Sequence, residues 1–203
     1  MARKVFISFR CSDGHLYKEE LARIFNNYDD VINCSENVDR SNMSEATIRY
    51  YLYKKLSNTS VTIVLLTPQA INHKRNNWGN IDDWIYDEIR YSLEDRENNR
   101  CNGLIAVYTP EAEKLVVEKG QEVTIIKNFE NLARKNMLNI KDRFKHCSTP
   151  DRYNPDLDSY CSLVSWEKFV SNPNYYIEKA IYKRDNKEQY DIQKNMQNNK
   201  GYW

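Results

Sequence analysis

The chain has 203 residues, a length typical of one ordinary domain or of one domain with an insertion. Hydrophobic residues make up 40% and aromatic residues 12%, which is enough to build a core and excludes wholesale disorder. The 30 basic and 29 acidic residues give a net charge of +1, so no global field attracts the protein to nucleic acid or to a membrane surface.

The cysteines and the apolar runs indicate the cellular compartment of the protein. The 5 cysteines are scattered and form no Cys-x-x-Cys pair and no Cys/His pair at zinc-finger spacing, which favours a reducing compartment and gives no metal site. The apolar run at residues 5–9 is too short for a signal peptide, and the run at 61–66 is far below the ~18 residues of a membrane-spanning helix. We therefore expect a cytoplasmic protein with neither a nucleic acid nor a membrane as partner.

Strands and helices alternate in the first half of the chain. Short β-branched or aromatic runs predict strands at residues 5–9, 31–34, 61–66 and 104–108. Apolar residues at helical spacing follow each of the first three runs, with Ser12 or Asp13 as candidate cap of the first helix and Asn42 as candidate cap of the second. This alternation predicts a doubly wound, mainly parallel α/β sheet flanked by helices.

The second half of the chain shows weaker patterns. Residues 123–126 read as a short strand or as part of an insertion, residues 163–166 as a fifth strand, and the apolar spacing around residue 177 as a closing helix. The polar stretch 145–158 reads as a long loop, and the Gln/Asn/Lys-rich residues 186–203 as a frayed tail after a single domain spanning 1–185. Because both polar segments offer few apolar residues to bury, we expect both to be dispensable for folding.

Common nucleotide and metal motifs are missing. The chain has neither Gly-x-Gly-x-x-Gly nor Gly-x₄-Gly-Lys-[Ser/Thr], and its three histidines have no ligand partner at metal spacing. A receiver-type phosphoacceptor requires an aspartate after the third strand, where Thr67 and Pro68 stand. A cysteine–histidine nucleophile stays open, because such pairs meet in space rather than in sequence.

The most informative segment is residues 83–89. On a helix, Trp84 and Glu88 lie one turn apart, at the edge of the buried face that carries Ile85 and Ile89. Asp87 has Arg90 three residues later, whereas no cation lies three or four residues from Glu88. Two interpretations stay open: Glu88 is a carboxylate in a functional pocket, or it is a boundary residue paired with a cation from another element.

These residues together resemble a known family. The opening strand Val-Phe-Ile-Ser-Phe-Arg at 5–10, the segment Thr-Ser-Val-Thr at 59–62 and Trp84-x-x-x-Glu88 are similar to a TIR domain, and more narrowly to the TIR-like branch of the bacterial Thoeris anti-phage system. The resemblance covers residues 3–110 best. It implies a flavodoxin-like (TIR-like) fold, here with a C-terminal insertion or elaboration.

The resemblance also implies an activity. Catalytic members of the family cleave NAD at the nicotinamide–ribose bond, so NAD is the substrate and no separate cofactor is expected. By correspondence, Glu88 is the catalytic glutamate, Phe9 and Arg10 belong to the first-strand loop that lines the nucleotide pocket, and Trp84 precedes the glutamate by one turn. The product is an ADP-ribose, in cyclic form a signal for an effector protein.

Two alternatives from other classes stay open. The first is a non-catalytic TIR-like adaptor that acts by self-association, and the second is an N-ribosyl hydrolase or transferase that uses Glu88 on another nucleoside. The Arg-Asp-x-x-Pro-Gly box of receptor-type TIR domains is missing, since residues 36–44 contain no proline or glycine. The loop that mediates assembly in receptor-type TIR domains therefore differs in sequence here, so we leave the assembly geometry open, and a phage-derived trigger is an expectation from the resemblance alone.

Overall fold

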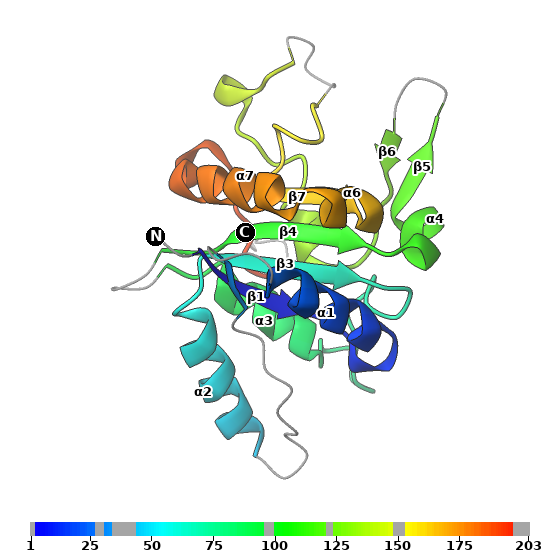
Figure 1. The fold of residues 1–203 in the computed structure, drawn as a ribbon, viewed down its shortest axis with the longest axis vertical. Helices are drawn as coiled ribbons and strands as arrows, with labels where there is room; N and C mark the ends of the chain where they lie inside the picture. Colours follow the sequence, from blue (N-terminus) through cyan, green and yellow to red (C-terminus); the bar gives the residue numbers. More distant parts are fainter. Residues whose placement is uncertain are drawn as a thin grey trace, which may run out of the picture.

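The computed structural model describes residues 3–26, 31–33, 44–95, 100–120, 124–147 and 153–196. Its centre is a five-stranded parallel sheet in the order β2-β1-β3-β4-β7 (Figure 1). The strands are β1 (Arg3–Ser8), β2 (Val31–Asn33), β3 (Val61–Leu66), β4 (Gly103–Tyr108) and β7 (Cys161–Ser165). This is the strand order of a flavodoxin-like, doubly wound sheet, so the predicted fold class is confirmed.

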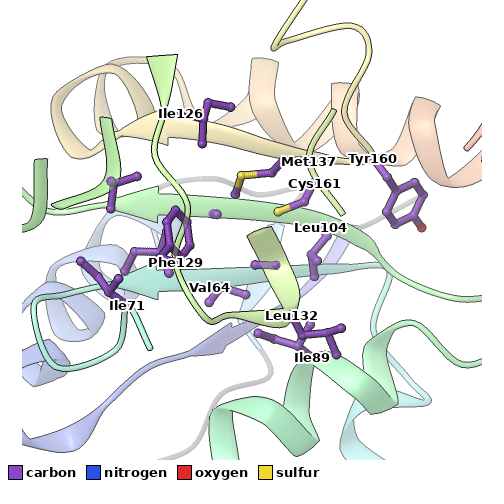
Figure 2. Close-up of a cluster of buried hydrophobic side chains, with 14 of the residues drawn as sticks. Val64, Ile71, Ile89, Leu104, Ile126, Phe129, Leu132, Met137, Tyr160 and Cys161 are labelled. Atoms are coloured by element: carbon purple, nitrogen blue, oxygen red, sulfur yellow. The ribbon is translucent and has the colours of Figure 1, made fainter. Parts of the chain in front are cut away.

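Helices cover both faces of the sheet. On one face α1 (Cys11–Phe25), α6 (Trp166–Ser171) and α7 (Pro173–Asp185) pack on alternate residues of the strands, such as Ile7 and Ile63. On the other face lie α2 (Glu45–Leu56), α3 (Trp84–Ser92) and the short α5 (Leu132–Lys135). Figure 2 shows Ile89 of α3 and Leu132 side by side within the cluster that also holds Val64 of β3. Successive residues of a strand therefore serve opposite layers of the core.

An elaboration joins β4 to β7. It contains the 3₁₀ segment Pro110–Ala112, α4 (Glu113–Val116), the antiparallel pair β5 (Val117–Lys119) and β6 (Thr124–Ile126), α5 and the 3₁₀ segment Asp142–Phe144. The β5–β6 ribbon projects beyond the end of β4 (Figure 1). Residues 124–126 of the predicted run are thus a strand within an insertion, and residue 123 lies outside the described residues.

Several predicted element ends need correction. Arg10 occupies the N-cap position of α1 and no side chain caps that helix, because Asp13 instead accepts hydrogen bonds from Thr67 Oγ1 at 2.7 Å and from the main-chain N–H of Gln69 at 2.9 Å. Ser44 caps α2 by accepting from the N–H of Thr47, and the predicted cap Asn42 lies outside the described residues. The fifth strand ends at Ser165, whose side chain caps α6, so the following tryptophan begins that helix.

The predicted frayed tail is wrong for residues 187–196. After α7 the chain forms a short 3₁₀ turn (Lys187–Gln189), and Tyr190 pairs with Ile140 in a β-bridge while its ring is buried. Gln193 and Asn136 exchange two hydrogen bonds of 2.9 Å, and Ile192 and Met196 pack against the cluster of Figure 2. A few apolar side chains spaced along a polar segment are therefore enough to hold it on the core. Residues 197–203 lie outside the described residues.

The predicted loop at 145–158 is also organised, although residues 148–152 lie outside the described residues. The carboxylate of Asp158 is fully buried and accepts hydrogen bonds from the N–H and Nδ1 of His146 and from the N–H of Asn154. Burial alone raises the pKa of Asp158, but these hydrogen bonds outweigh it and hold the pKa below its ordinary value. The described part of the segment is thus held by a buried carboxylate whose oxygens are hydrogen-bonded, and its dispensability for folding stays a prediction.

A membrane-spanning helix must be both long and apolar. Among the described residues, no helix has the length and the apolar character that crossing a bilayer demands.

Candidate functional site

A buried contact joins the end of β1 to the middle of α3. Ser8 is the last residue of β1, and its side chain lies on the same face of the sheet as Phe6, which packs against α2. The Ser8 hydroxyl donates a 2.6 Å hydrogen bond to Oε2 of Glu88. Glu88 is only 8% exposed, beside Ile85 and Ile89. The helical spacing therefore places Glu88 as predicted, at the buried edge of α3 and at the carboxyl end of a parallel strand.

A second contact joins the residue before α1 to the residue before α3. Nη2 of Arg10 lies 2.9 and 3.0 Å from the two carboxylate oxygens of Asp83, the N-cap residue of α3. Oδ2 of Asp83 also lies 2.9 Å from Nδ1 of His73 and accepts from the N–H of Lys74 at 3.3 Å. Burial by itself raises the pKa of Asp83, but hydrogen bonds from His73 and Arg10 and the charge of Arg10 outweigh it, so the pKa lies below its ordinary value. Asp83 is a carboxylate at neutral pH.

The protonation of His73 follows from its two neighbours. The main-chain N–H of Leu132 donates to Nε2 of His73 at 2.9 Å, so Nε2 is an acceptor and carries no proton. Nδ1 then carries the proton and donates to Asp83. The ring is therefore a neutral imidazole in one tautomer, and both ring nitrogens are used.

Adjacent acids on α3 have different surroundings. Asp87 lies 3.6 Å from Nη2 of Arg90, the helical pair expected from the sequence, and 3.5 Å from Nε of Arg49 on α2. Glu88 accepts the hydrogen bond from the Ser8 hydroxyl of the sheet. These contacts come from different elements, although the two carboxylates are consecutive in the chain.

The structure brings most of the predicted site residues to one place, but not all of them. Trp84 is the first residue of α3 and remains 40% exposed beside Asp83. Phe9 points to the opposite side of the sheet, where it packs with the α1–α7 layer, and a methyl group added at Gly14 would lie 3.3 Å from its Cβ. Glu88, Arg10 and Trp84 therefore line one junction, and Phe9 lies behind it. Their roles in binding and catalysis stay predictions.

Sequence reasoning missed Asp83 and His73. A signal existed for each, because an aspartate directly before a helix is a typical cap residue and His73 lies in the loop after β3, at the edge where ligands bind. No local spacing joins them, however, since Arg10 and Leu132, which complete the network, come from distant segments.

Two cavities of the described structure lie beside α3 and at the ends of β4 and β7. The smaller, of about 420 Å³, lies on the outer side of α3 and is lined by Asp83, Asp87, Arg49, Arg90 and other residues. The larger, of about 660 Å³, lies at the ends of β4 and β7, between the β5–β6 ribbon and α6–α7. Within the described ranges, no group of three or more His, Cys, Asp or Glu side chains is arranged to hold a metal ion.

A flavodoxin-like sheet with a buried glutamate facing the end of its first strand defines a TIR-like α/β protein. A family model described as the TIR-like domain of the Thoeris protein ThsB matches residues 6–114, more than half of the chain. The chain belongs to this family and is a defence-related TIR-like protein, so the resemblance of its motifs is confirmed. Arg10, His73, Asp83 and Glu88 lie inside the matched region, and Leu132 lies outside it.

Proposed function

We propose that this protein cleaves NAD at the nicotinamide–ribose bond, with Glu88 as its catalytic residue. The observation that carries the proposal is the buried Ser8–Glu88 contact at the carboxyl end of β1. In a sheet of this strand order, ligands bind beyond the carboxyl ends of the strands at the switch point beside β1 and β3. Membership of the TIR-like Thoeris family supports NAD as the substrate.

The chemistry requires one well-placed anion. The bond between the ribose C1′ and the pyridinium nitrogen breaks, and its electron pair leaves with nicotinamide, which becomes neutral. The ribose then acquires an oxocarbenium-like positive charge, which the Glu88 carboxylate stabilises while it accepts hydrogen bonds from ribose hydroxyls. Because Glu88 is mostly removed from water, this electrostatic effect is stronger than it would be at the surface.

The fate of the ribosyl cation determines the product. Attack by water gives ADP-ribose and releases a proton, whereas attack by a group of the same molecule, such as the adenine ring, gives a cyclic ADP-ribose. We propose the cyclic form as the signal, read by a separate effector protein. Arg10, fixed by Asp83, supplies a positive charge that suits the diphosphate of NAD.

Nicotinamide release is the direct test. Purified protein is incubated with NAD, with and without lysate from phage-infected cells, and nicotinamide is measured over time. Release in either condition supports the proposal. Absence of release in both, with self-association retained, favours the adaptor instead, and release of a base from other nucleosides favours the alternative N-ribosyl enzyme.

Glu88→Gln tests the catalytic assignment. The substitution keeps the shape of the side chain and its ability to accept from Ser8, and it removes the negative charge, so we expect a loss of turnover of about 10²-fold or more. Asp87→Asn is the matched control, because it makes the same change one residue away in a carboxylate that pairs with Arg49 and Arg90. The control should keep most activity. An active Glu88→Gln with an unchanged melting temperature would remove the catalytic assignment.

A further inference from the structure

Arg10, Asp83 and His73 form a buried chain of three side chains. The side chain of Arg10 is 11% exposed, that of Asp83 1% and that of His73 2%. One positive guanidinium, one carboxylate and one neutral imidazole leave the chain without net charge. Because the three side chains are buried together, each link of this polar network constrains the next, although Nε of Arg10 and Oδ1 of Asp83 have no hydrogen-bond partner among the described residues.

Arg10 depends on Asp83 for its orientation. Its backbone occupies the N-cap of α1, and its long side chain has several rotatable bonds that must be fixed before substrate arrives. Within the part of the chain that the structure describes, the Nε of Arg10 is buried and has no hydrogen-bond partner, so the contact with Asp83 is what holds the guanidinium. An anion-binding group that is fixed in advance loses less entropy on binding.

His73 in turn determines how the Asp83 carboxylate lies. Oδ2 of Asp83 accepts from Nδ1 of His73, and the edge of the imidazole meets the ring of Tyr86 on α3 at a centroid distance of 5.2 Å. If the proton were on Nε2, it would oppose the N–H of Leu132, and the lone pair of Nδ1 would oppose the carboxylate. Only one tautomer satisfies both contacts, and it donates to Asp83.

The position of His73 is set by a segment outside the matched family region. The N–H of His73 donates to the carbonyl of Glu130 at 2.8 Å, and the N–H of Glu130 donates to Asn72 Oδ1 at 2.8 Å. Asn131 Nδ2 donates to the carbonyl of Ala70 at 3.0 Å. Together with the Leu132 contact, these bonds join residues 130–132 to residues 70–73 along their length, and Figure 2 shows Leu132 and Ile71 within the same apolar cluster.

We infer that His73 is a positioning residue for substrate binding: through Asp83 it fixes Arg10 to receive the diphosphate of NAD, and the main chain of Leu132 fixes His73. The inference rests on the proposed function and adds the means by which the C-terminal elaboration controls the site. In this arrangement His73 acts through Asp83 and does not itself contact the substrate.

Two substitutions separate the links of this network. In His73→Gln, the side-chain amide reaches the place of Nε2, so it accepts from Leu132 but no longer donates to Asp83. In His73→Asn, the amide nitrogen takes the place of Nδ1, so it donates to Asp83 but no longer accepts from Leu132. We expect His73→Gln to raise the KM for NAD about tenfold with kcat within about threefold, because uniform binding is lost. His73→Asn should bring the KM back toward the wild-type value, even where its melting temperature is lower.

His146→Gln is the matched control. His146 also donates from Nδ1 to a buried aspartate, Asp158, but in the distant loop before β7. The His146→Gln substitution should lower the melting temperature and leave the KM for NAD unchanged. If the KM instead rises in all three variants in proportion to the loss of melting temperature, the role of His73 is only structural and the inference is wrong.

A readout without turnover keeps this test distinct from that of the proposed function. The ¹⁵Nε–Hε resonance of Arg10, assigned by its loss in Arg10→Lys, reports how firmly the guanidinium is held. We expect a sharp, dispersed signal in the wild-type protein and in His73→Asn, and a shifted or averaged signal in His73→Gln. An unchanged Arg10 signal in His73→Gln overturns the inference. If the wild-type protein releases no nicotinamide but the Arg10 signal changes as expected, the proposed function fails while the positioning of Arg10 by His73 stands.

Discussion

A neutral hydroxyl holds the central carboxylate of the site. Ser8 donates a hydrogen bond to Oε2 of Glu88, so this contact fixes one carboxylate oxygen without itself adding a counter-charge. A lysine or arginine in the same place would fix Glu88 equally well but would neutralise it. The choice of serine at the end of β1 is therefore consistent with an electrostatic role for Glu88.

Ser8→Ala tests this orientation. Removing the hydroxyl takes away the hydrogen bond that orients Oε2 of Glu88 and leaves the charge in place, so we expect turnover of NAD to fall about tenfold and stability to fall by about 1–2 kcal/mol. Steady-state kinetics and urea unfolding measure the two effects separately. Ser92→Ala serves as control, because it removes a buried hydroxyl of α3 that contacts Thr62 Oγ1 and the main-chain carbonyl of Glu88, each at 2.7 Å, rather than the Glu88 carboxylate. The control should lose stability and keep its turnover; an equal loss of turnover in both variants would contradict a specific role for Ser8.

At the scale of elements, residues 187–196, which follow α7, cover part of the apolar cluster that also contains Leu132 and Ala133 of α5. Tyr190 is 5% exposed, and its ring meets Tyr160 edge-on at a centroid distance of 5.6 Å. Two main-chain hydrogen bonds hold the segment in place: the N–H of Lys141 donates to the carbonyl of Gln189, and the N–H of Asp191 donates to the carbonyl of Asn139. The segment is thus a structural element that packs on the elaboration between β4 and β7.

Truncation distinguishes the two parts of this segment. We expect a chain that ends at Asp185 to lose at least about 3 kcal/mol of stability, because it uncovers the side chains that Tyr190 and Ile192 bury. A chain that ends at Met196 is the control and should melt close to the full-length protein. Thermal unfolding followed by circular dichroism measures both. Equal melting temperatures for the two truncated chains would show that residues 186–196 add nothing to stability.

For the whole molecule, local patterns predicted the fold better than the site. The runs that became β3 and β4 are continuous and apolar because helices cover both faces of the sheet, and this property is visible in a few consecutive residues. The place of Glu88 also followed from helical spacing. In contrast, the contacts of Asp83 join residues 10, 73 and 83, and such long-range partners leave no periodic signal. The tail was misjudged because three apolar residues in a polar segment resemble a solvated chain.

A buried lysine makes the stability of the whole molecule depend on pH. Lys183 is 2% exposed and donates to the carbonyl of Asp156 and to Ser162 Oγ, while burial lowers its pKa from 10.5 to about 8. Between these two values the folded protein holds fewer protons than the unfolded chain. The free energy of unfolding therefore rises with pH across this window, by at most about 1.4 kcal/mol per pH unit.

Lys183→Met removes this dependence. We expect the difference in unfolding free energy between the wild-type protein and the variant to shift in favour of the wild type as the pH rises from 8 to 10. Urea unfolding at pH 7, 8, 9 and 10 measures the difference. The tyrosines that titrate nearby are common to both proteins, so their contribution largely cancels. A difference that stays constant with pH would show that Lys183 keeps its ordinary titration in the folded state.

The distance along the chain between β4 and β7 has a consequence for biosynthesis. The two strands are neighbours in the sheet, yet the whole elaboration must be translated after Gly103–Tyr108 before Cys161–Ser165 emerges. At about 5–20 residues per second, the free edge of β4 waits roughly 3–10 seconds on the ribosome for its partner. An apolar strand with an open edge can pair with a strand of another nascent chain. Translation pauses within the elaboration should therefore lower the yield of folded protein, and holdase chaperones that cover this edge should restore it.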